Sequence, residues 1–435
     1  MNPLNLPLSR LLIYAHLLAA IVSTGATAMA ADWPQWRGIN RDGVWNETGI
    51  LETFPAEGLK IVWRAPVGSS WSSAVVAQGR VYVRDAQLHK PKVDERLHCL
   101  DAGTGKELWS QVYEVTYPDW AFAPDQVSGP TSTPCVHDGK VYTLGQRGDV
   151  FCLDAATGAV LWHRSMIDDY KMKEFTSNLS PMVEGRLLIL PVGGKPDAGV
   201  VALDKDTGRE VWRSLDEDQT NSSPIIVTAA GRRQLIVWTQ QSVSSLDPAN
   251  GKVLWRERLL TAQDSAVATP VSDGTLLLIG GMMFKLDADK PGATVLWPDN
   301  RSLTHRILSN TSTAMLREGH VYSAKSKGEL VCLDALTGKE SWSTDKATDK
   351  RGAFGPSIHL TPNGDFVFLY NDKGELIHAK LTPQGYQEIS RALLLAPVYK
   401  FGGHLVNWAP PAYADGRVFA RNEKEIVCAE LRAGR

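Results

Sequence analysis

The chain repeats one polarity pattern, in which a short apolar run ends at an aspartate, a polar turn follows, and a second short run ends in tryptophan. The clearest copy, Leu-Asp-Ala-Gly-Thr-Gly-Lys-Glu-Leu-Trp, runs from Leu100 to Trp109. Further copies occupy 153–162, 203–212, 246–255 and 333–342, and a copy with an enlarged turn occupies 286–297. Self-similarity at such a period predicts a repeat architecture.

Each copy predicts a β-hairpin that carries one large aromatic anchor. An aspartate at a strand end can accept hydrogen bonds from backbone N–H groups further along and so start a turn. The glycine four residues after each aspartate, as in Gly105, supplies the positive φ that a tight hairpin needs. The tryptophans in this register are Trp63, Trp109, Trp162, Trp212, Trp255, Trp297 and Trp342.

The runs between successive copies predict four strands in each unit. In the second unit these strands are expected at 132–136, 140–144, 149–153 and 160–162, separated by Gly- and Asp-containing turns. The same order can be followed from Ser180, Ser223, Thr269, Thr313, Pro356 and Pro411. The unit around 375–385 lacks the pattern of aspartate, polar turn and tryptophan but keeps the strand spacing, so we count it as one of the repeat units.

The two ends of the repeat region complement each other. Residues 60–64 match the last strand of a unit without the strands that should precede it, whereas 408–431 supply three strands without the fourth. The N-terminal strand is therefore expected to complete the last unit, which closes the ring and removes exposed sheet edges. The predicted fold is all-β, an eight-bladed β-propeller of four-stranded blades over 60–435. Residues 31–59 form a Trp-rich arm expected to pack on it.

Residues 1–30 have the features of an export signal. Arg10 precedes an apolar run over 11–22, and Ala28-Met29-Ala30 fits the small-x-small cleavage rule. We therefore expect a periplasmic or secreted protein, cleaved near Ala30, with no transmembrane segment in the mature chain. The 46 basic and 48 acidic residues give a formal charge of −2, which argues against nucleic acid as a partner. A monomer is expected.

The five cysteines do not predict disulfides. Four of them occupy one equivalent repeat position: Cys99, Cys152, Cys332 and Cys428. Equivalent positions in neighbouring units should lie beyond the roughly 7 Å that a disulfide permits between Cα atoms. These four are therefore interpreted as small buried hydrophobic residues. Cys135 lies in a different strand, and no zinc-ligand or haem-attachment spacing is present.

The Leu-Asp-x-x-Thr-Gly-x-x-x-Trp phrase resembles the pyrroloquinoline-quinone (PQQ) repeat of quinoprotein-alcohol-dehydrogenase-like propellers. The resemblance covers nearly everything after Lys60. It implies either a periplasmic quinone-dependent dehydrogenase or a non-enzymatic scaffold similar to BamB. The opening Trp-Pro-Gln-Trp-Arg-Gly motif (33–38) and the closing 422–428 segment are similar to those of a group of secreted propellers. In such dehydrogenases the quinone lies between a tryptophan and a disulfide of adjacent cysteines, beside a calcium ion. This chain has no adjacent cysteines.

The candidate functional surface is the mouth of the central channel where the loops enter the innermost strands. These loops bring aromatic, amide, hydroxyl and basic side chains together, as small-molecule and peptide sites do. The ligand-binding candidates are Trp71, Asn178, Asn221, Arg306, Asn310, Thr311, Phe354, Asn407 and Trp408. The alternative is that these side chains only fill the channel. The insertion over 113–129, with Tyr117, Trp120 and Phe122, is a candidate roof for this mouth.

The sequence favours a binding function over catalysis. The packing residues of the repeats form a complete set, whereas no catalytic residue, metal ligand or nucleophile motif stands out. The leading hypothesis is an exported propeller that recognises a protein, peptide or glycan at its channel mouth without chemistry of its own. The alternative is a dehydrogenase of alcohols or sugars that depends on PQQ and Ca²⁺.

Overall fold

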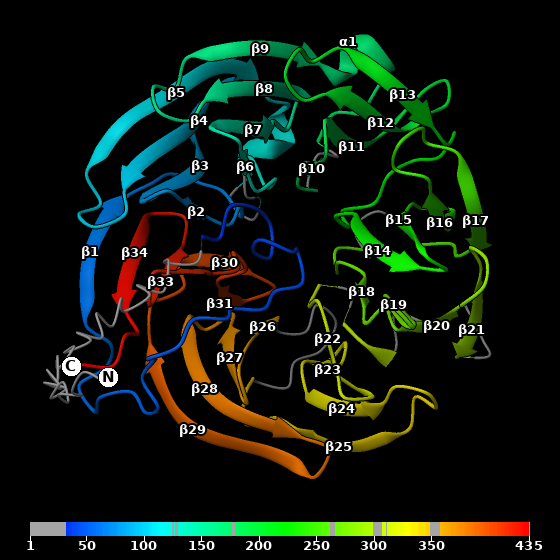
Figure 1. Cartoon of the computed structure of the whole chain (residues 1–435). Helices are drawn as coiled ribbons and strands as arrows, with labels where there is room; N and C mark the ends of the chain where they lie inside the picture. Colours follow the sequence, from blue (N-terminus) through cyan, green and yellow to red (C-terminus); the bar gives the residue numbers. More distant parts are fainter. Residues whose placement is uncertain are drawn as a thin grey trace, which may run out of the picture.

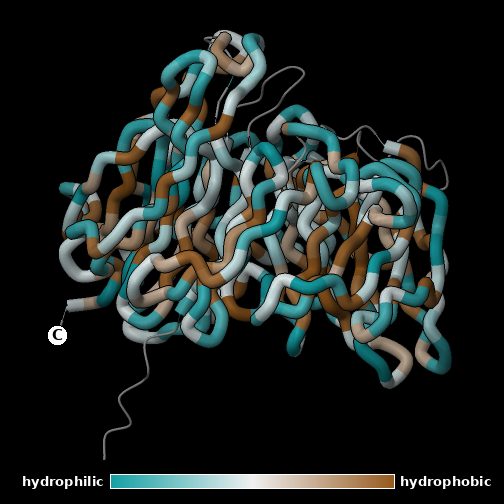
Figure 2. The backbone as a smooth tube through the Cα atoms, turned by 90° about the horizontal axis from the view of Figure 1, so that it is seen from above, coloured by the Kyte–Doolittle hydropathy of each residue, from teal (hydrophilic) through white to brown (hydrophobic). Residues whose placement is uncertain are grey.

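Eight four-stranded antiparallel sheets stand around a central axis and form a closed ring (Figure 1). A computed structural model describes residues 32–123, 126, 129–175, 179–261, 266–298, 307–309, 311–348 and 357–434. The predicted eight-bladed propeller is therefore confirmed, whereas the predicted export signal lies outside the described residues. Viewed edge-on, the apolar segments run through the body of the disc (Figure 2).

The sheets are numbered here as blades one to eight, each from its innermost to its outermost strand. Blade one consists of β2 (Val75–Ala77), β3 (Arg80–His89), β4 (Lys92–Asp101) and β5 (Glu107–Thr116), and blade two of β6 (Cys135–His137), β7 (Lys140–Leu144), β8 (Asp149–Asp154) and β9 (Val160–Ser165). Blade three consists of β10 (Met182–Glu184), β11 (Leu187–Gly194), β12 (Ala198–Asp204) and β13 (Glu210–Ser214), and blade four of β14 (Ile225–Ala229), β15 (Arg232–Trp238), β16 (Ser242–Leu246) and β17 (Val253–Arg258).

Blades five to eight follow the same order, and the last one includes the N-terminal strand. Blade five consists of β18 (Val271–Ser272), β19 (Leu276–Ile279), β20 (Met282–Leu286) and β21 (Ala293–Trp297), and blade six of β22 (Met315–Arg317), β23 (His320–Ala324), β24 (Leu330–Asp334) and β25 (Glu340–Thr344). Blade seven consists of β26 (Ile358–Asn363), β27 (Phe366–Asn371), β28 (Glu375–Thr382) and β29 (Gly385–Leu393), and blade eight of β32 (Ala412–Ala414), β33 (Arg417–Arg421), β34 (Glu425–Glu430) and β1 (Ile61–Pro66). Outside the blades lie a short helix α1 (Met166–Tyr170), a 3-10 turn (Asp119–Phe122) and a hairpin of β30 (Tyr399–Phe401) and β31 (His404–Val406).

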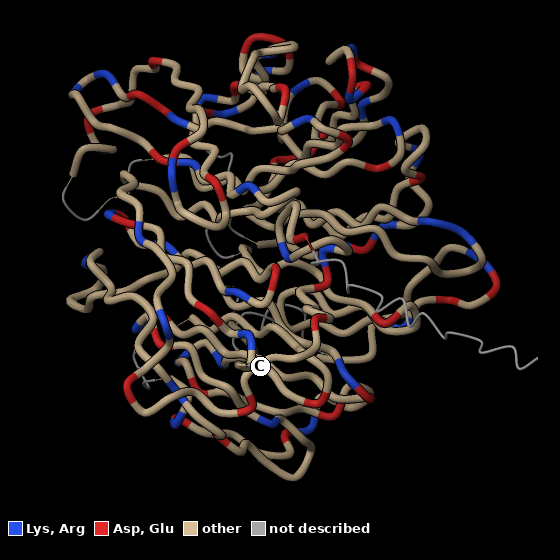
Figure 3. Tube along the Cα trace, turned by 60° about the vertical axis from the view of Figure 1, so that its left-hand side comes forward, with Lys and Arg blue, Asp and Glu red and all other residues tan. Residues whose placement is uncertain are grey.

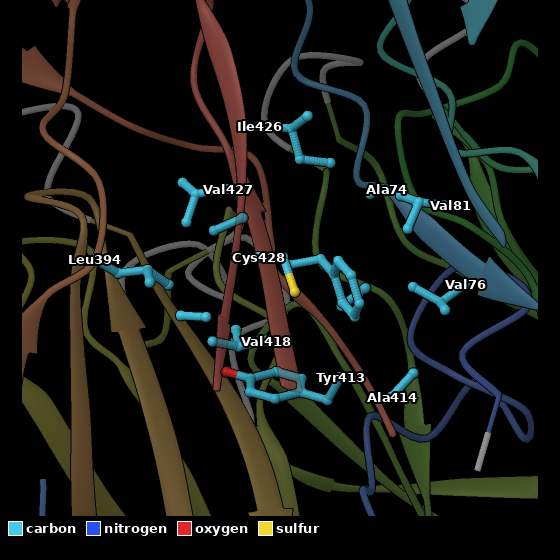
Figure 4. Packing of buried hydrophobic residues seen from close by; sticks show 14 of the residues in the cluster. Ala74, Val76, Val81, Leu394, Tyr413, Ala414, Val418, Ile426, Val427 and Cys428 are labelled. Atoms are coloured by element: carbon cyan, nitrogen blue, oxygen red, sulfur yellow. The ribbon is translucent and has the colours of Figure 1, made fainter. Parts of the chain in front are cut away.

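The first strand of the ring completes the last blade, as the sequence predicts. β1 pairs antiparallel with β34, with Trp63 opposite Cys428 and Arg64 opposite Val427. The junction between blade eight and blade one is filled by buried apolar side chains, including Val76, Val418 and Cys428 (Figure 4). The ring therefore closes through backbone pairing between the two ends of the chain and through an apolar interface.

The tryptophans join neighbouring blades by one recurring contact. The Trp63 indole donates a hydrogen bond of 2.9 Å to the carbonyl oxygen of Ala102, in the turn of the next blade. In that turn Asp101 Oδ1 accepts from the Thr104 backbone N–H and hydroxyl, both at 2.8 Å. A Cβ added at Gly105, where φ is +71°, would lie 2.6 Å from the Trp63 ring. Glycine is thus required both for the turn and for the approach of the indole.

The contact recurs along the ring and varies where the phrase varies. Trp109, Trp162, Trp212 and Trp297 donate to the corresponding carbonyls of the next blade. Trp342 donates to Thr382 O at 2.8 Å, which confirms that the unit lacking the phrase is a blade. Trp255 faces the enlarged turn over 287–292 and donates to Gln234 Oε1 at 2.9 Å in its own blade.

The cysteines are free thiols in the interior of the blades, as predicted. Cys99, Cys152, Cys332 and Cys428 have no measurable exposure, and Cys135 is also buried. Each of the four repeat cysteines lies on the third strand of its blade and faces an aromatic residue of the second strand or a tryptophan of the fourth. They act as small apolar residues inside the sheet packing.

The N-terminal arm, residues 32–59, crosses the centre of the ring instead of staying on the rim (Figure 1). Trp33 pairs with Val76 of blade one through two backbone hydrogen bonds of 2.8 and 2.9 Å. Two blades away around the ring, the Trp45 backbone N–H donates to Pro362 O of blade seven at 2.9 Å. Both indoles are buried, so these arm tryptophans serve packing.

Between Trp33 and Trp45 the arm places the side chains of Arg41 and Trp36 in the channel. The Arg41 guanidinium is 5% exposed and donates to the carbonyl oxygens of Ser180, Pro181 and Pro224, from blades three and four. Burial lowers the pKa of Arg41 to about 10. The Trp36 indole donates to Thr269 Oγ1 of blade five at 2.8 Å. The arm therefore ties at least five blades to the centre of the ring.

Blade one carries an ionic cluster that the repeat pattern does not predict. Asp85 has no measurable exposure and accepts from Arg96 at 2.7 Å and from His98 Nε2 at 3.1 Å. Burial alone would raise the pKa of the Asp85 carboxyl, but the bonds from His98 and Arg96 outweigh burial and hold it well below its usual range. His98 also reaches Glu107 Oε2 at 2.7 Å, so the imidazole lies between two carboxylates.

The free energy of unfolding is expected to depend on pH through His98. Burial would lower the His98 pKa, but the bonds to Asp85 and Glu107 outweigh it and raise the pKa above 6.5. A raised folded-state pKa means that the stabilisation is fully present below the unfolded-state value and is lost as pH rises through the folded-state value. In urea unfolding measurements from pH 6 to pH 9, the free energy of unfolding should fall less steeply for His98→Gln than for the wild type. A variant with the wild-type slope would contradict the assignment.

Candidate functional site

The candidate site lies on the loop face, defined here as the face formed by the segments that lead into the innermost strands. Trp71 precedes β2, and Trp408 precedes β32 of the adjoining blade. Their ring centroids are 4.8 Å apart in an edge-to-face arrangement. The hairpin of β30 and β31 adds Tyr399, 5.5 Å from Trp71, and Phe401, 4.8 Å from Trp408. We call these four side chains the aromatic cluster.

The aromatic cluster is partly accessible, although its rings pack on one another. Trp71, Phe401 and Trp408 are half-buried, whereas Tyr399 is buried. The hairpin tip next to the cluster presents Leu405, which is 54% exposed. Aromatic rings that combine large area with partial exposure are typical of interaction surfaces. The cluster is therefore able to contribute apolar and stacking contacts to a ligand.

Polar groups lie directly beneath the aromatic cluster. Asn407 is 1% exposed and donates to the Tyr370 hydroxyl at 2.8 Å, while its Oδ1 has no partner among the described residues. Burial raises the pKa of Glu423, against the lowering influence of the Arg421 cation and the Trp71 indole. Arg421 is fully buried and donates to three backbone carbonyl oxygens. Buried hydrogen bonds thus hold the base of the cluster in position.

A second aromatic group occupies the loop face near blade two. Trp120 is 55% exposed and lies 4.9 Å from Phe175, which in turn lies 4.8 Å from the buried Tyr117. The predicted roof over 113–129 is shorter than expected, because β5 continues to Thr116 and places Tyr113 inside the blade. Among the described residues that follow Thr116, Trp120 is exposed to solvent.

The structure brings three of the nine predicted site residues together. Trp71, Asn407 and Trp408 belong to the aromatic cluster or its base. Asn221 is half-buried before β14, and Thr311 is exposed before β22, 2.9 Å from Ser309 Oγ. The other four, Asn178, Arg306, Asn310 and Phe354, lie outside the described residues. The sequence reasoning missed Tyr399, Phe401 and Glu423; the alternating Tyr-Lys-Phe segment 399–401 before a Gly-Gly turn was the available signal for the two aromatic residues.

The described side chains do not supply the donor set that the dehydrogenase resemblance implies for quinone and calcium. The five cysteines are separate free thiols inside the blades. Over the described part of the chain, no three His, Cys, Asp or Glu side chains converge as a metal site would require. In the channel itself, the arm inserts Arg41 and Trp36. We therefore derive no chemical step through a quinone.

The fold and its blade contacts define a class of protein, the propellers built from PQQ repeats. The chain matches the family model described as outer membrane protein assembly factor BamB, with matches at residues 51–165, 93–284 and 285–382. These matches span most of the repeat region. The chain belongs to this PQQ-repeat, BamB-type family.

Curated relatives fall into two functional groups. Polyvinylalcohol dehydrogenase of Sphingopyxis is 25% identical over 63% of this chain and 47% of its own length. Quinoprotein alcohol dehydrogenase PedH of Pseudomonas putida is 31% identical over 32% of this chain and 25% of its own length. BamB of Moranella endobia is 23% identical over 69% of this chain and 75% of its own length. The chain therefore spans less than half the length of the polyvinylalcohol dehydrogenase and of PedH.

Solved structures from both groups share the fold. BamB of Moraxella catarrhalis superposes with a TM-score of 0.57 and 16% identity, covering 86% of this chain and 99% of its own. Quinohemoprotein alcohol dehydrogenase of Comamonas testosteroni gives 0.61 and 14% identity, covering 93% of this chain and 81% of its own. At these identities the likeness shows the fold alone. No described helix is long and apolar enough to cross a bilayer.

Proposed function

We propose that the protein is an exported binding propeller that holds a polypeptide partner on its loop face without chemistry of its own. The observation that carries this proposal is the aromatic cluster, in which Trp71, Phe401 and Trp408 remain partly accessible above fixed polar groups. The arm inserts Trp36 and Arg41 into the centre of the ring, which favours the loop face over the channel as the surface that holds a polypeptide.

Charge and family membership support a polypeptide partner. Basic and acidic residues are interspersed along the chain (Figure 3), and their near balance of 46 against 48 favours no polyanion. The family model carries the description outer membrane protein assembly factor BamB, and an assembly role on proteins supports a polypeptide ligand. Export is expected from the signal-like residues 1–30.

Trp408→Ala is expected to weaken polypeptide binding by about tenfold to a hundredfold, because a central aromatic anchor carries a large share of interface energy. The mature protein would be used to select peptides from a displayed random library, and the Kd of the enriched peptides would be measured by calorimetry. Leu336→Ala is the matched control, since Leu336 is 61% exposed on the turn of blade six. Equal affinity of Trp408→Ala and wild type for every selected peptide would refute the proposal.

The dehydrogenase alternative is favoured by the relatives that oxidise alcohols. It predicts dye-linked oxidation of an alcohol or sugar panel after incubation with PQQ and Ca²⁺. Our proposal predicts no quinone-dependent turnover. Saturable turnover that is lost in Trp408→Ala or Asn221→Ala would establish the dehydrogenase alternative in place of our proposal. Saturable binding of oligosaccharides with no peptide binding would change the ligand class to a glycan.

A further inference from the structure

A pocket of about 360 Å³ lies where the arm passes over blade seven, away from the loop face. Arm residues 46–52 form one wall, and the turn between β26 and β27, with His378 of β28, forms the other. This volume lies within the range of small-molecule pockets. The pocket exists only because the arm is docked, since seven of its twelve lining residues belong to the arm.

His378 has a defined protonation state at the base of this pocket. Its Nδ1 lies 2.9 Å from the carbonyl oxygen of Glu52, which can only accept, so Nδ1 carries the proton. The imidazole is 3% exposed, and burial lowers its pKa despite the nearby Glu52 carboxylate. At neutral pH the ring is therefore neutral, and Nε2 bears a lone pair.

The Nε2 lone pair of His378 is directed to the pocket. The ring stacks on Phe368 with an interplanar angle of 14° and a centroid distance of 4.9 Å, and Phe366 packs against it at 4.8 Å. No described residue hydrogen-bonds Nε2, and this atom is not among the fully buried polar atoms without a partner. It therefore keeps contact with the pocket space and offers a hydrogen-bond acceptor there.

The charged lining of the pocket is acidic only. Glu47, Glu52 and Asp365 contribute carboxylates, and no lysine or arginine belongs to the lining. Glu47 is already engaged by the backbone N–H groups of Asp415 at 2.7 Å and Gly416 at 2.5 Å. Asp365 lies 3.9 Å from Arg317. Glu52 is exposed and, among the described residues, has no cation within ion-pair distance, so its carboxylate is available to a ligand.

The geometry points to a binding site for a ligand with a primary ammonium group, which donates to His378 Nε2 and to the Glu52 carboxylate. His378 Nε2 and the Glu52 carboxylate both accept hydrogen bonds, and Phe366 supplies an aromatic wall for the alkyl part of the ligand. The described side chains do not converge as metal ligands, so an organic cation fits better than a metal ion. This site is independent of the loop face.

Calorimetry with two probes tests the site and distinguishes a free amine from a lysine side chain. The probes are 1,4-diaminobutane and Nα-acetyl-lysine methylamide, with 1-butanol as the uncharged control. Saturable binding of at least one amine and none of butanol is expected. Glu52→Gln should weaken it by about tenfold, the scale of a charge-assisted hydrogen bond. Glu57→Gln, an exposed arm position outside the lining, should bind as wild type does.

His378→Asn provides a second, structural check. The asparagine amide can keep the donor to the Glu52 carbonyl oxygen but lacks the acceptor at Nε2, so amine binding should be lost while the melting temperature shows a folded protein. Absence of amine binding to the wild type, equal binding of butanol, or wild-type affinity in Glu52→Gln would each overturn the proposal. None of these outcomes bears on peptide binding at the loop face.

Discussion

Trp63→Ala is expected to lower the free energy of unfolding by about 3–5 kcal/mol, the usual cost of removing a large buried aromatic side chain. The indole is 7% exposed and joins the closing strand to blade one through its hydrogen bond to Ala102 O. Its loss leaves a cavity where the two ends of the chain meet. Urea unfolding followed by circular dichroism would measure the effect.

The matched control for this variant is Trp120→Ala. Trp120 is 55% exposed, so its removal should change the free energy of unfolding by less than about 1 kcal/mol. Gly105→Ala should resemble Trp63→Ala, because its Cβ would strike the same indole and its φ is +71°. A loss below about 1 kcal/mol for Trp63→Ala would contradict the role assigned to ring closure.

Glu95→Leu is expected to be destabilising by about 3–5 kcal/mol, because it leaves a buried cation without its counter-ion. Glu95 Oε2 lies 2.9 Å from Arg84 and 2.6 Å from the Tyr113 hydroxyl, and Oε1 lies 2.7 Å from the Tyr117 hydroxyl. Glu95 has no measurable exposure and Arg84 is 1% exposed, so water cannot replace the lost contacts. Equilibrium urea unfolding measures the change.

The double variant Arg84→Met/Glu95→Leu separates charge from shape. It removes both charges and should recover part of the stability lost in Glu95→Leu, since an apolar pair can replace a buried ion pair. Glu114→Leu is the surface control, because the Glu114 ion pair with Lys92 is solvent-exposed and worth little. If the double variant were less stable than Glu95→Leu, the unpaired Arg84 charge would not be the cause of the loss.

The fold could be predicted from the sequence because its determinants are local and repeated. The Asp and Gly of each turn specify a hairpin, and the Trp of the preceding blade packs on that turn, as Asp101, Gly105 and Trp63 show. The incomplete first and last units specify closure, which the pairing of Trp63 with Cys428 confirms. The degenerate unit was recognisable from spacing, and Trp342 still finds a carbonyl there.

The site was less predictable because its geometry depends on segments outside the repeats. Counting back from the innermost strands located Trp71 and Trp408, which do lie together. The hairpin that contributes Phe401 has no counterpart in other units, so no periodicity indicated it. The buried cluster around Glu95 depends on side chains that the other blades do not repeat, and the His378 pocket depends on a contact between distant residues, His378 and Glu52, 326 positions apart.

Site-specific photo-crosslinking in cells tests the proposed binding surface most directly. A photoreactive residue at Leu405, next to the aromatic cluster, is compared with one at Leu336, which has a similar exposure of 61% against 54%. We predict one dominant polypeptide adduct from Leu405, identified by mass spectrometry, none from Leu336, and loss of the Leu405 adduct when Trp408→Ala is added. The same adduct from both positions, or an adduct insensitive to Trp408→Ala, would contradict binding at the loop face.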